Sequence, residues 1–477
     1  MLFEEEVVFV LGIDSSTQST KAVVVNSEDG VVVSEGKSPH PPQTEIDPAV
    51  WWTACGEAVR QALDQAPGPV EAVSVAGQQH GLVPLDNGGT PLRDALLWND
   101  TRSAPQAREL IERHGADELA ERTGLVPVAS FTLPKLAWLA ENEPHNAERL
   151  DRVLLPHDWV TWRLAGRPEQ AYTDRGDASG TGYFSPESGE WLPELCREVL
   201  GGRTPRLPEI LGPSDKAGEV NGLDELSGAV LAPGTGDNMA AALGMGIGPG
   251  DVVVSLGTSG TAFAVSDHPT SEGTGTVAGF CDATGRHLPL VCTLNAARVL
   301  DSTANALGTD LDGLSDLALS AAPGAGGLTL IPYLEGERTP DLPEATGSLT
   351  GMRGTNMTPE NLARASVEGM LCGLADGVEA LREVGATVRR VLLIGGAADS
   401  PAVRATAPSL FGVDVHVPEP AEYVALGAAK QAAWVAAGTE QPPDWQLRYE
   451  RYEVGDVDSG AEVRDAYRRA RTRVYGV

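Results

Sequence analysis

The chain has 477 residues, with 35 Lys and Arg against 67 Asp and Glu, and its net charge is −32. Because 42% of the residues are hydrophobic, the chain can bury a core in each of two or three ordinary domains, which excludes intrinsic disorder. The strong negative charge repels nucleic-acid backbones and anionic membrane surfaces, so neither is expected as a partner.

A predicted β-hairpin opens the chain and recurs about half a chain later. Strands rich in β-branched residues at 7–13 and 21–25 flank the polar turn 14–20, which is a typical hairpin pattern. Residues 251–265 repeat the order of strand, Gly/Ser/Thr turn and strand. We therefore expect two related domains, since a solenoid would repeat with a much shorter period, and Pro/Gly-rich stretches at 201–213 and 232–250 mark the neighbourhood of the boundary.

Strands and helices are predicted to alternate after each hairpin. Asp47 and Pro48 supply the cap and first residue of a helix, and Thr358 and Pro359 do the same later. Such alternation is typical of α/β layers. The expected elements are a helix at 48–63, a strand at 70–76, a helix from 359 to about 385, a strand at 388–394, a helix at 401–411, a strand at 413–417 and an Ala-rich helix at 425–438.

The cysteines and the N-terminus favour a cytoplasmic protein. The five cysteines form no C-x-x-C pair and have no nearby histidine at zinc-site spacing, so neither disulfides nor structural zinc are expected. Acidic residues at 4–6 precede the first apolar run, unlike the basic start of a signal peptide. No apolar stretch reaches the about 18 residues that a membrane span needs.

Two turns are candidates for holding phosphate. Asp14 ends the first strand and is followed by Thr17, Thr20 and Lys21. Hydroxyls and free backbone N–H groups can surround a phosphate, and Asp14 could hold a hydrated Mg²⁺. An ordinary hairpin turn is the alternative for this segment alone. The repeated turn contributes Gly257, Thr258 and Ser259. Two such turns facing each other across a cleft would form one nucleotide site.

Asp237 is the candidate general base. It follows a Gly-Thr-Gly segment and precedes Asn238 and an apolar run that reads as a helix. A carboxylate at this position can accept the proton of a hydroxyl that attacks a phosphoryl group. The alternative is that Asp237 only caps the helix.

Polar side chains at two further strand ends are candidates for binding small molecules. Gln79 and His80 follow the strand at 70–76, with Trp98 further along, and this combination suits a polyhydroxylated substrate. His80 could instead be structural. Gly395 and Gly396, with Ser400 behind them, follow the strand at 388–394 and could let an adenosine approach the backbone, although a tight βα turn is the alternative.

Together these motifs resemble the FGGY family of carbohydrate kinases, from Gly12 to about Gly438, and within it the xylulokinases. The resemblance implies an α/β fold of two actin-like (ribonuclease-H-like) ATPase domains with a cleft between them. Residues 1–243 would form the sugar-binding domain and residues 244–477 the nucleotide-binding domain. It also implies a homodimer that uses ATP and Mg²⁺.

The resemblance assigns a role to each candidate residue. Asp237 would be the base for O5 of a ketopentose, most simply D-xylulose, with Asp14 near the metal. The residues implied for the sugar are Gln79, His80, Trp98 and Asn238; those implied for the nucleotide are Thr17, Thr20, Lys21, Gly257, Thr258, Ser259, Gly395, Gly396 and Ser400.

Departures from the family pattern leave alternatives open. Gln79 stands where the family more often has Met, and Ser15 and Ser16 stand where Gly-Thr is common. D-ribulose, L-ribulose or glycerol could replace D-xylulose as the substrate. An actin-like ATPase that phosphorylates no metabolite and a catalytically silent sugar-binding regulator are the remaining alternatives. Because the chain is so acidic, we expect activity to depend steeply on Mg²⁺.

Overall fold

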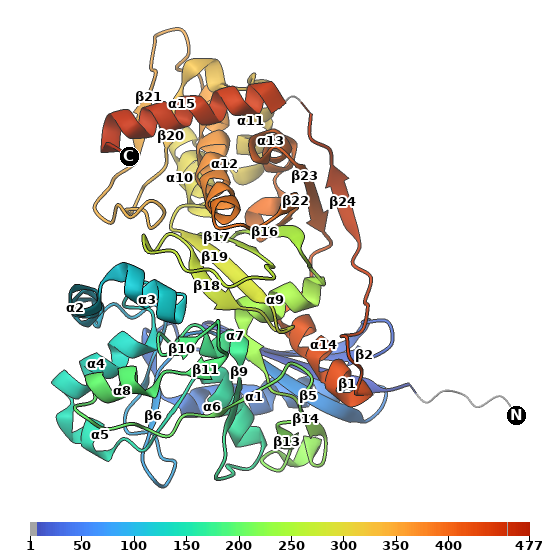
Figure 1. The fold of residues 1–477 in the computed structure, drawn as a ribbon. Coiled ribbons are helices and arrows are strands. Elements are labelled where there is room, and N and C mark those ends of the chain that lie inside the picture. Colours follow the sequence, from blue (N-terminus) through green and yellow to red (C-terminus); the bar gives the residue numbers. More distant parts are fainter. Residues whose placement is uncertain (1–6, 456) are drawn as a thin grey trace, which may run out of the picture.

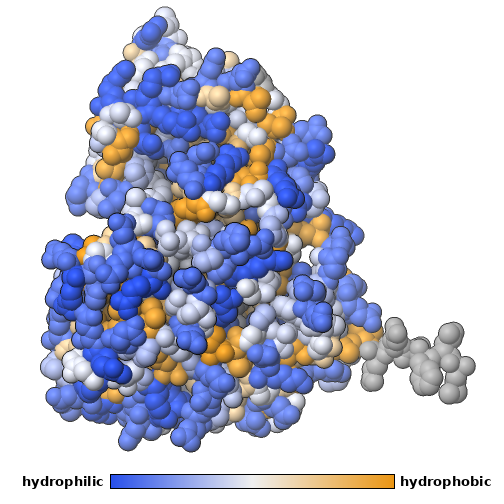
Figure 2. Space-filling view, viewed as in Figure 1, coloured by the Kyte–Doolittle hydropathy of each residue, from blue (hydrophilic) through white to orange (hydrophobic). Residues whose placement is uncertain are grey.

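The computed structural model describes residues 7–455 and 457–477, and the acidic residues at 4–6 lie outside this part. The chain forms two halves, each built on its own β-sheet, as Figure 1 shows. The space-filling view has an indentation between the two halves on its left side (Figure 2). Within the described residues, no helix combines the length and the apolar content needed to cross a bilayer.

The first sheet is built around the predicted hairpin. Strand β1 (Phe9–Ser15) pairs antiparallel with β2 (Ser19–Asn26) and parallel with β5 (Val70–Gly77), within the order β13-β14-β5-β1-β2-β3. The turn is shorter than expected because β1 extends through Ser15. The short strand β15 (Thr235–Gly236) joins the carboxyl end of β5, which brings a segment far along the chain to the end of β1 and β5.

The second sheet repeats this arrangement. Strand β16 (Gly250–Leu256) pairs antiparallel with β17 (Gly260–Ala264) and parallel with β22 (Val388–Ile394), within the order β18-β19-β17-β16-β22-β23-β24. A hairpin followed by a parallel third strand therefore occurs in both halves, and the predicted internal repeat is confirmed.

The remaining elements follow in chain order. In the first half they are β3 (Val32–Pro39), β4 (Glu45–Ile46), α1 (Pro48–Leu63), β6 (Val83–Leu85), β7 (Ala95–Leu96), α2 (Ala104–His114), α3 (Ala116–Thr123), α4 (Thr132–Asn142), α5 (Pro144–Arg149), β8 (Arg152–Leu154), α6 (Pro156–Leu164), β9 (Tyr172–Asp174), α7 (Arg175–Ala178), β10 (Phe184–Ser185), β11 (Glu190–Trp191), α8 (Pro193–Val199), β12 (Glu209–Leu211), β13 (Gly218–Glu219), η1 (Asp224–Leu226) and β14 (Val230–Leu231). Those that follow are α9 (Asp237–Met245), β18 (Ala278–Cys281), β19 (His287–Thr293), α10 (Ala297–Leu307), α11 (Leu311–Ser320), η2 (Ala325–Gly327), β20 (Thr329–Ile331), β21 (Ser348–Thr350), α12 (Pro359–Glu383), η3 (Gly396–Asp399), α13 (Pro401–Phe411), β23 (Asp414–Pro418), α14 (Tyr423–Ala437), β24 (Tyr449–Tyr452) and α15 (Val457–Tyr475).

Most of the expected elements are confirmed with small shifts at their ends. Helices α1 and α13 and strand β22 have the predicted bounds. Helix α12 ends at Glu383 rather than near residue 385, and α14 begins two residues earlier than expected, at Tyr423.

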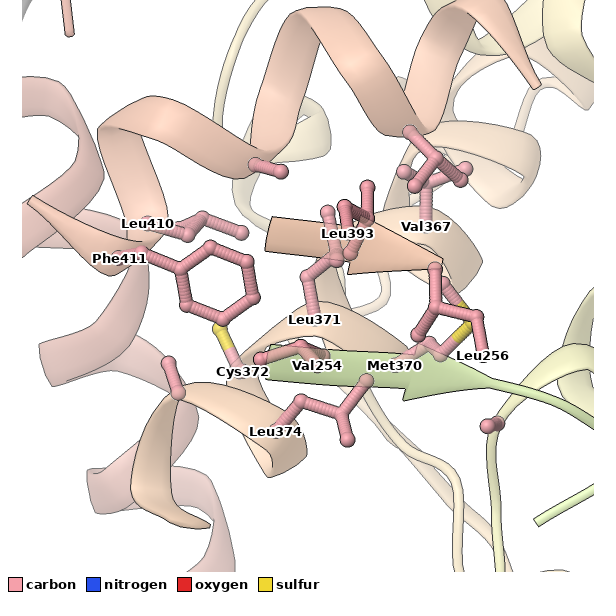
Figure 3. Packing of buried hydrophobic residues seen from close by; sticks show 14 of the residues in the cluster. Val254, Leu256, Val367, Met370, Leu371, Cys372, Leu374, Leu393, Leu410 and Phe411 are labelled. Atoms are coloured by element: carbon pink, nitrogen blue, oxygen red, sulfur yellow. The ribbon is translucent and has the colours of Figure 1, made fainter. Parts of the chain in front are cut away.

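The core of the second half lies between its sheet and helix α12 (Figure 3). Apolar residues of α12 pack against side chains from the middle of the sheet and against the end of α13. The residues labelled in the close-up are Val254, Leu256, Val367, Met370, Leu371, Cys372, Leu374, Leu393, Leu410 and Phe411. This packing fixes where β16 and β22 end, and therefore where the turns that follow them lie.

The two halves exchange helices at their junction. Helix α14 packs on β1, β2 and β5 of the first sheet, as Figure 1 shows, and also contacts α9. Helix α9 in turn packs its apolar side against residues of the second sheet. The boundary predicted after residue 243 falls inside α9, and we propose that α9 and α14 together form the joint between the two domains.

Backbones approach closely at this joint because glycines lie where α14 crosses α9 and β1. A Cβ atom on Gly427 of α14 would overlap the carbonyl oxygen of Ala240 in α9. A Cβ on Gly12 of β1 would likewise overlap the carbonyl oxygen of Ala425. These contacts require glycine, since any side chain would push the backbones apart.

Candidate active site

Three cavities lie around the ends of the central strands. The first, which we call the Asp237 cavity, has a volume of about 230 Å³. It is lined from the first half by Gln79, His80, Trp98, Ser130, Phe131, Asp237 and Asn238, and from the second half by Thr261, Gly275, Thr276, Ala278, Phe280, Leu290, Cys292 and Arg338. The Asp14 cavity measures about 440 Å³ and the Ser400 cavity about 380 Å³, and both are lined by Gly396.

Pairing of β15 with β5 places the candidate base beside the candidate sugar loop. Asp237 begins α9 directly after β15, and Gln79 follows the end of β5. The Asn238 backbone N–H and Nδ2 donate to Oδ1 of Asp237 at 2.8 and 2.9 Å, and Nδ2 also donates to Oε1 of Gln79 at 3.3 Å. The structure therefore brings these three predicted residues together in one cavity.

The Asp237 carboxyl group binds a proton more tightly than an ordinary aspartate does. Burial raises its pKa to about 7, and the nearby charge of Asp14 acts in the same direction. The hydrogen bonds from Asn238 favour the ionised form but do not cancel this effect. A pKa near neutrality suits a general base, because the group is largely free to accept a proton and then holds it well.

His80 is held in a conformation that few non-glycine residues adopt. Its φ angle is 67°, and its carbonyl oxygen accepts hydrogen bonds from Thr132 Oγ1 and Lys135 Nζ, both at 3.2 Å. Backbone strain of this kind persists only where the surroundings hold it in place, and it is common at functional sites.

The His80 ring is neutral and presents one nitrogen as an acceptor. Burial lowers its pKa to about 3, and the nearby Lys135 charge adds to this shift. Nδ1 lies 2.8 Å from the carbonyl oxygen of Gly180, so it carries the proton and donates. Nε2 is then the unprotonated nitrogen, available to a hydroxyl group, while Phe131 and Phe280 flank the ring.

The Asp14 cavity has groups that fit a hydrated cation. Asp14 is only 2% exposed and accepts a hydrogen bond of 2.5 Å from Ser16 Oγ. Burial raises the pKa of Asp14 to about 6, so a bound cation would stabilise the ionised carboxylate. One carboxylate with a neighbouring hydroxyl suits Mg²⁺, which keeps most of its waters. Lys21 also lines this cavity, but its ammonium is paired with Glu422 at 2.5 Å.

The second turn and the loop after β22 meet at the Ser400 cavity. Gly257, Thr258, Gly396 and Ser400 line it, and Gly395 lines the adjoining Asp14 cavity. Gly395 has a φ of 89°, and a Cβ there would lie 2.7 Å from the carbonyl carbon and carbonyl oxygen of Leu256. Glycine is therefore required for this loop to lie against the end of β16.

Three predicted nucleotide residues, Thr17, Thr20 and Ser259, line none of these cavities, although Thr17 contacts Trp98. The Thr20 side chain is buried and its hydroxyl is hydrogen bonded to the His40 ring at 2.9 Å. Ser259 is exposed and lines none of the three cavities. Trp98 Nε1 donates to Thr17 Oγ1 at 2.9 Å, which ties the first turn to the Asp237 cavity.

Several residues of the site carry no motif and were not predicted. Lys135 is fully buried, and burial lowers its pKa to about 7. Its place in the apolar helical run TLPKLAWLA is a signal that could have marked it. Phe131, Phe280 and Arg338 come from loops or strand interiors, and no local pattern distinguishes them.

A buried cluster of His157, Asp158 and Asp177 supports the site from behind. The nitrogen and oxygen atoms of these side chains lie close enough together to hold a metal ion. However, each carboxylate faces a different nitrogen of the His157 ring, so the ring lies between them. Asp177 Oδ2 lies 2.6 Å from Nδ1, and Asp158 Oδ1 lies 3.3 Å from Nε2.

This arrangement suits an imidazolium ion. Burial alone would lower the pKa of His157, but the two carboxylates outweigh it and raise the pKa. The His157 side chain fills the space where a Cβ on Gly77 or Gly234 would lie, so it packs beneath both the sugar loop and the loop that leads to Asp237.

The chain resembles known proteins along most of its length. The model of the FGGY family of carbohydrate kinases, N-terminal domain, matches residues 9–244, and that of the C-terminal domain matches residues 252–436. The xylulose kinase of Streptomyces coelicolor is 47% identical over 440 residues, covering 90% of this chain and 89% of that protein. The xylulose kinase of Streptomyces rubiginosus is 47% identical over 451 residues, covering 92% and 90%.

The crystal structure of xylulose kinase from Bifidobacterium adolescentis superposes with a TM-score of 0.91 at 46% identity, and covers 98% of this chain and 99% of that chain. This match along nearly the whole chain confirms the predicted fold of two actin-like α/β domains.

Proposed function

The chain belongs to the FGGY family of carbohydrate kinases, and we propose that it transfers the γ-phosphoryl group of ATP to O5 of D-xylulose. The arrangement of Asp237 beside Gln79 and His80, in one cavity between the two halves, is the observation that carries this proposal. The xylulose kinases at 47% identity support the choice of sugar.

Each residue of the cavity has a role in this reaction. Asp237 accepts the proton of the O5 hydroxyl as that oxygen attacks the γ-phosphoryl group. Nε2 of His80 accepts a hydrogen bond from a second hydroxyl of the sugar. Nε2 of Gln79 is buried without a hydrogen-bond partner among the described residues, and a sugar oxygen would supply the acceptor it lacks.

The nucleotide would lie across the other two cavities. Gly257, Thr258, Gly395 and Gly396 would hold its phosphates, with the adenosine near Ser400. Mg²⁺ would bind beside Asp14 and supply positive charge that the acidic chain lacks. The rings of Phe131 and Phe280 flank His80 and add apolar surface beside the sugar, which would help to exclude water and limit wasteful hydrolysis of ATP.

A substrate panel tests the proposal. kcat/KM for ATP-dependent phosphorylation should be highest for D-xylulose among D-xylulose, D-ribulose, L-ribulose, L-xylulose and glycerol. A preference for glycerol would overturn the assignment of the sugar. Hydrolysis of ATP without any phosphorylated product would instead point to an actin-like ATPase, and sugar binding without turnover would point to a regulator.

We also propose that the protein is a cytoplasmic homodimer. All five cysteines are free, as expected in a reducing compartment, and the dimer follows from the family resemblance. Light scattering of the purified protein would test the dimer, since a mass near that of one chain (49.9 kDa) would exclude it.

A further inference from the structure

We propose that Arg338 binds the sugar from the second half and recognises the ketose carbonyl oxygen, so that it determines the preference for a ketose over a polyol. This inference rests on the proposed function of the Asp237 cavity. No motif marks Arg338, and it lines the cavity opposite the residues of the first half.

The backbone of Arg338 is fixed on both sides. The carboxylate of Glu337 accepts hydrogen bonds from the backbone N–H groups of Leu294 at 2.6 Å and Arg338 at 2.8 Å, and from Asn295 Nδ2 at 2.9 Å. On the other side, Thr339 Oγ1 donates to the carbonyl oxygen of Cys292 at 2.8 Å. These bonds attach the segment to the end of β19, which leaves the Arg338 side chain to enter the cavity from a rigid support.

Among the residues that the structure describes, the Arg338 guanidinium group has no carboxylate partner. Among the described residues, no ion pair includes Arg338, whereas the nearby Arg298 is paired with Glu335 at 2.6 Å. It is also the only Lys or Arg among the residues that line the Asp237 cavity. In a chain with 67 acidic residues, an unpaired guanidinium facing a cavity points to a ligand as its partner.

The hydrogen-bonding chemistry of the cavity indicates which group of the sugar Arg338 binds. Asp237 and Nε2 of His80 act as acceptors and suit hydroxyl groups, which can donate. A carbonyl oxygen can only accept, and the guanidinium group offers five N–H donors and no acceptor. Arg338 is therefore matched to the one group that distinguishes an open-chain ketose from the corresponding polyol.

Binding measurements on variants test this proposal. In titration calorimetry without nucleotide, we expect Arg338→Met to raise the Kd for D-xylulose about ten- to hundredfold, as for loss of a hydrogen bond to a charged group. The Kd for xylitol should change by less than about threefold, and KM for the ketose should rise in parallel with Kd. Arg338→Lys should restore part of the affinity, because it keeps the charge without the planar fork.

Controls make each outcome decisive. Arg286→Met removes an exposed arginine that is paired with Asp267, and it should leave both Kd values unchanged. An unchanged Kd for D-xylulose in Arg338→Met, or equal losses for ketose and polyol, would overturn the inference. A fall in kcat alone would also overturn it, since that would assign Arg338 to phosphoryl transfer.

Two further outcomes can be told apart from a wrong role for Arg338: the Met variant does not fold, or the wild-type protein does not phosphorylate D-xylulose. If the Met variant does not fold, the Lys variant decides, and an unchanged Kd for D-xylulose in that variant would overturn the inference. Failure of the wild-type protein to phosphorylate D-xylulose would overturn the proposed function and not the role of Arg338, which would then be measured with whichever ketose the wild-type protein uses.

Discussion

Replacing Asp237 with Asn should remove activity and at the same time stabilise the folded protein. Loss of a positioned acid/base group typically lowers kcat by about 10²–10⁴. Asn keeps the size of the side chain and one oxygen that can accept the hydrogen bonds from Asn238. The gain in stability comes from removing a carboxylate that is buried close to the charge of Asp14.

The size of this gain follows from the shifted pKa. The pKa of Asp237 rises from 3.8 to about 7 on folding, so the folded state binds the proton more tightly than the unfolded state does. Stability is therefore lost as the pH rises from about 4 to about 7, and the full cost applies above that range. A shift of about three units corresponds to roughly 4 kcal/mol. Because Asp237 stays partly exposed to its cavity, solvent screening reduces the expected gain to roughly 1–3 kcal/mol.

Thermal unfolding of the substrate-free protein at two pH values measures this effect. Asp237→Asn should raise Tm clearly at pH 8 and much less at pH 5, where Asp237 is largely protonated in the folded state. Asp94→Asn, at an exposed aspartate, is the matched control and should change Tm little at either pH. A lower Tm at pH 8, or the same shift at both pH values, would refute the electrostatic reasoning.

Four further changes have clear expected outcomes. kcat/KM should rise as the pH increases through about 7, because the base must be ionised and the pKa of Asp237 is about 7; a flat profile from pH 6 to 8 would argue against Asp237 as the base. His80→Ala should raise KM for the sugar more than it lowers kcat, and an unchanged KM would leave His80 with a structural role only. Excess chelator should abolish turnover and added Mg²⁺ should restore it, whereas continued turnover in chelator would contradict a metal beside Asp14. Gly427→Ala should lower Tm, since overpacking typically costs about 1–3 kcal/mol and the new Cβ would overlap Ala240, while Gly354→Ala, where a Cβ meets open space, should not.

The sequence predicted the parts of the site that follow strands directly. Asp14, Gln79 and Gly395 each lie at or just beyond the carboxyl end of a parallel-paired strand. The repeated hairpin and the strand-ending motifs are local, so they can be recognised without knowing the fold. Asp237 is predicted in the same way, from a Gly-rich segment before a helix.

Residues that approach the site through tertiary packing could not be predicted. Arg338 depends on anchoring of its segment to residues 292–295, some 40 positions earlier in the chain. His157 lies on another helix and acts through contacts with two loops. The neighbours of Thr20 in sequence predict that it lies at the phosphate site, but alternation along β2 directs its side chain toward His40 instead.

Because α14 covers a sheet that is formed much earlier in the chain, the order of synthesis affects folding of the nascent protein. The face of the first sheet that receives α14 carries Val10, Val23, Val25 and Ala72, which are synthesised long before α14. Their cover, residues 423–437, is synthesised about 350 residues after Ala72. An apolar sheet face therefore stays uncovered until these residues have been made, which makes the nascent chain prone to aggregation and gives chaperones a site to hold. Premature termination anywhere before residue 423 would leave that face permanently exposed, so a truncated product should be cleared rather than accumulate as a working half-enzyme.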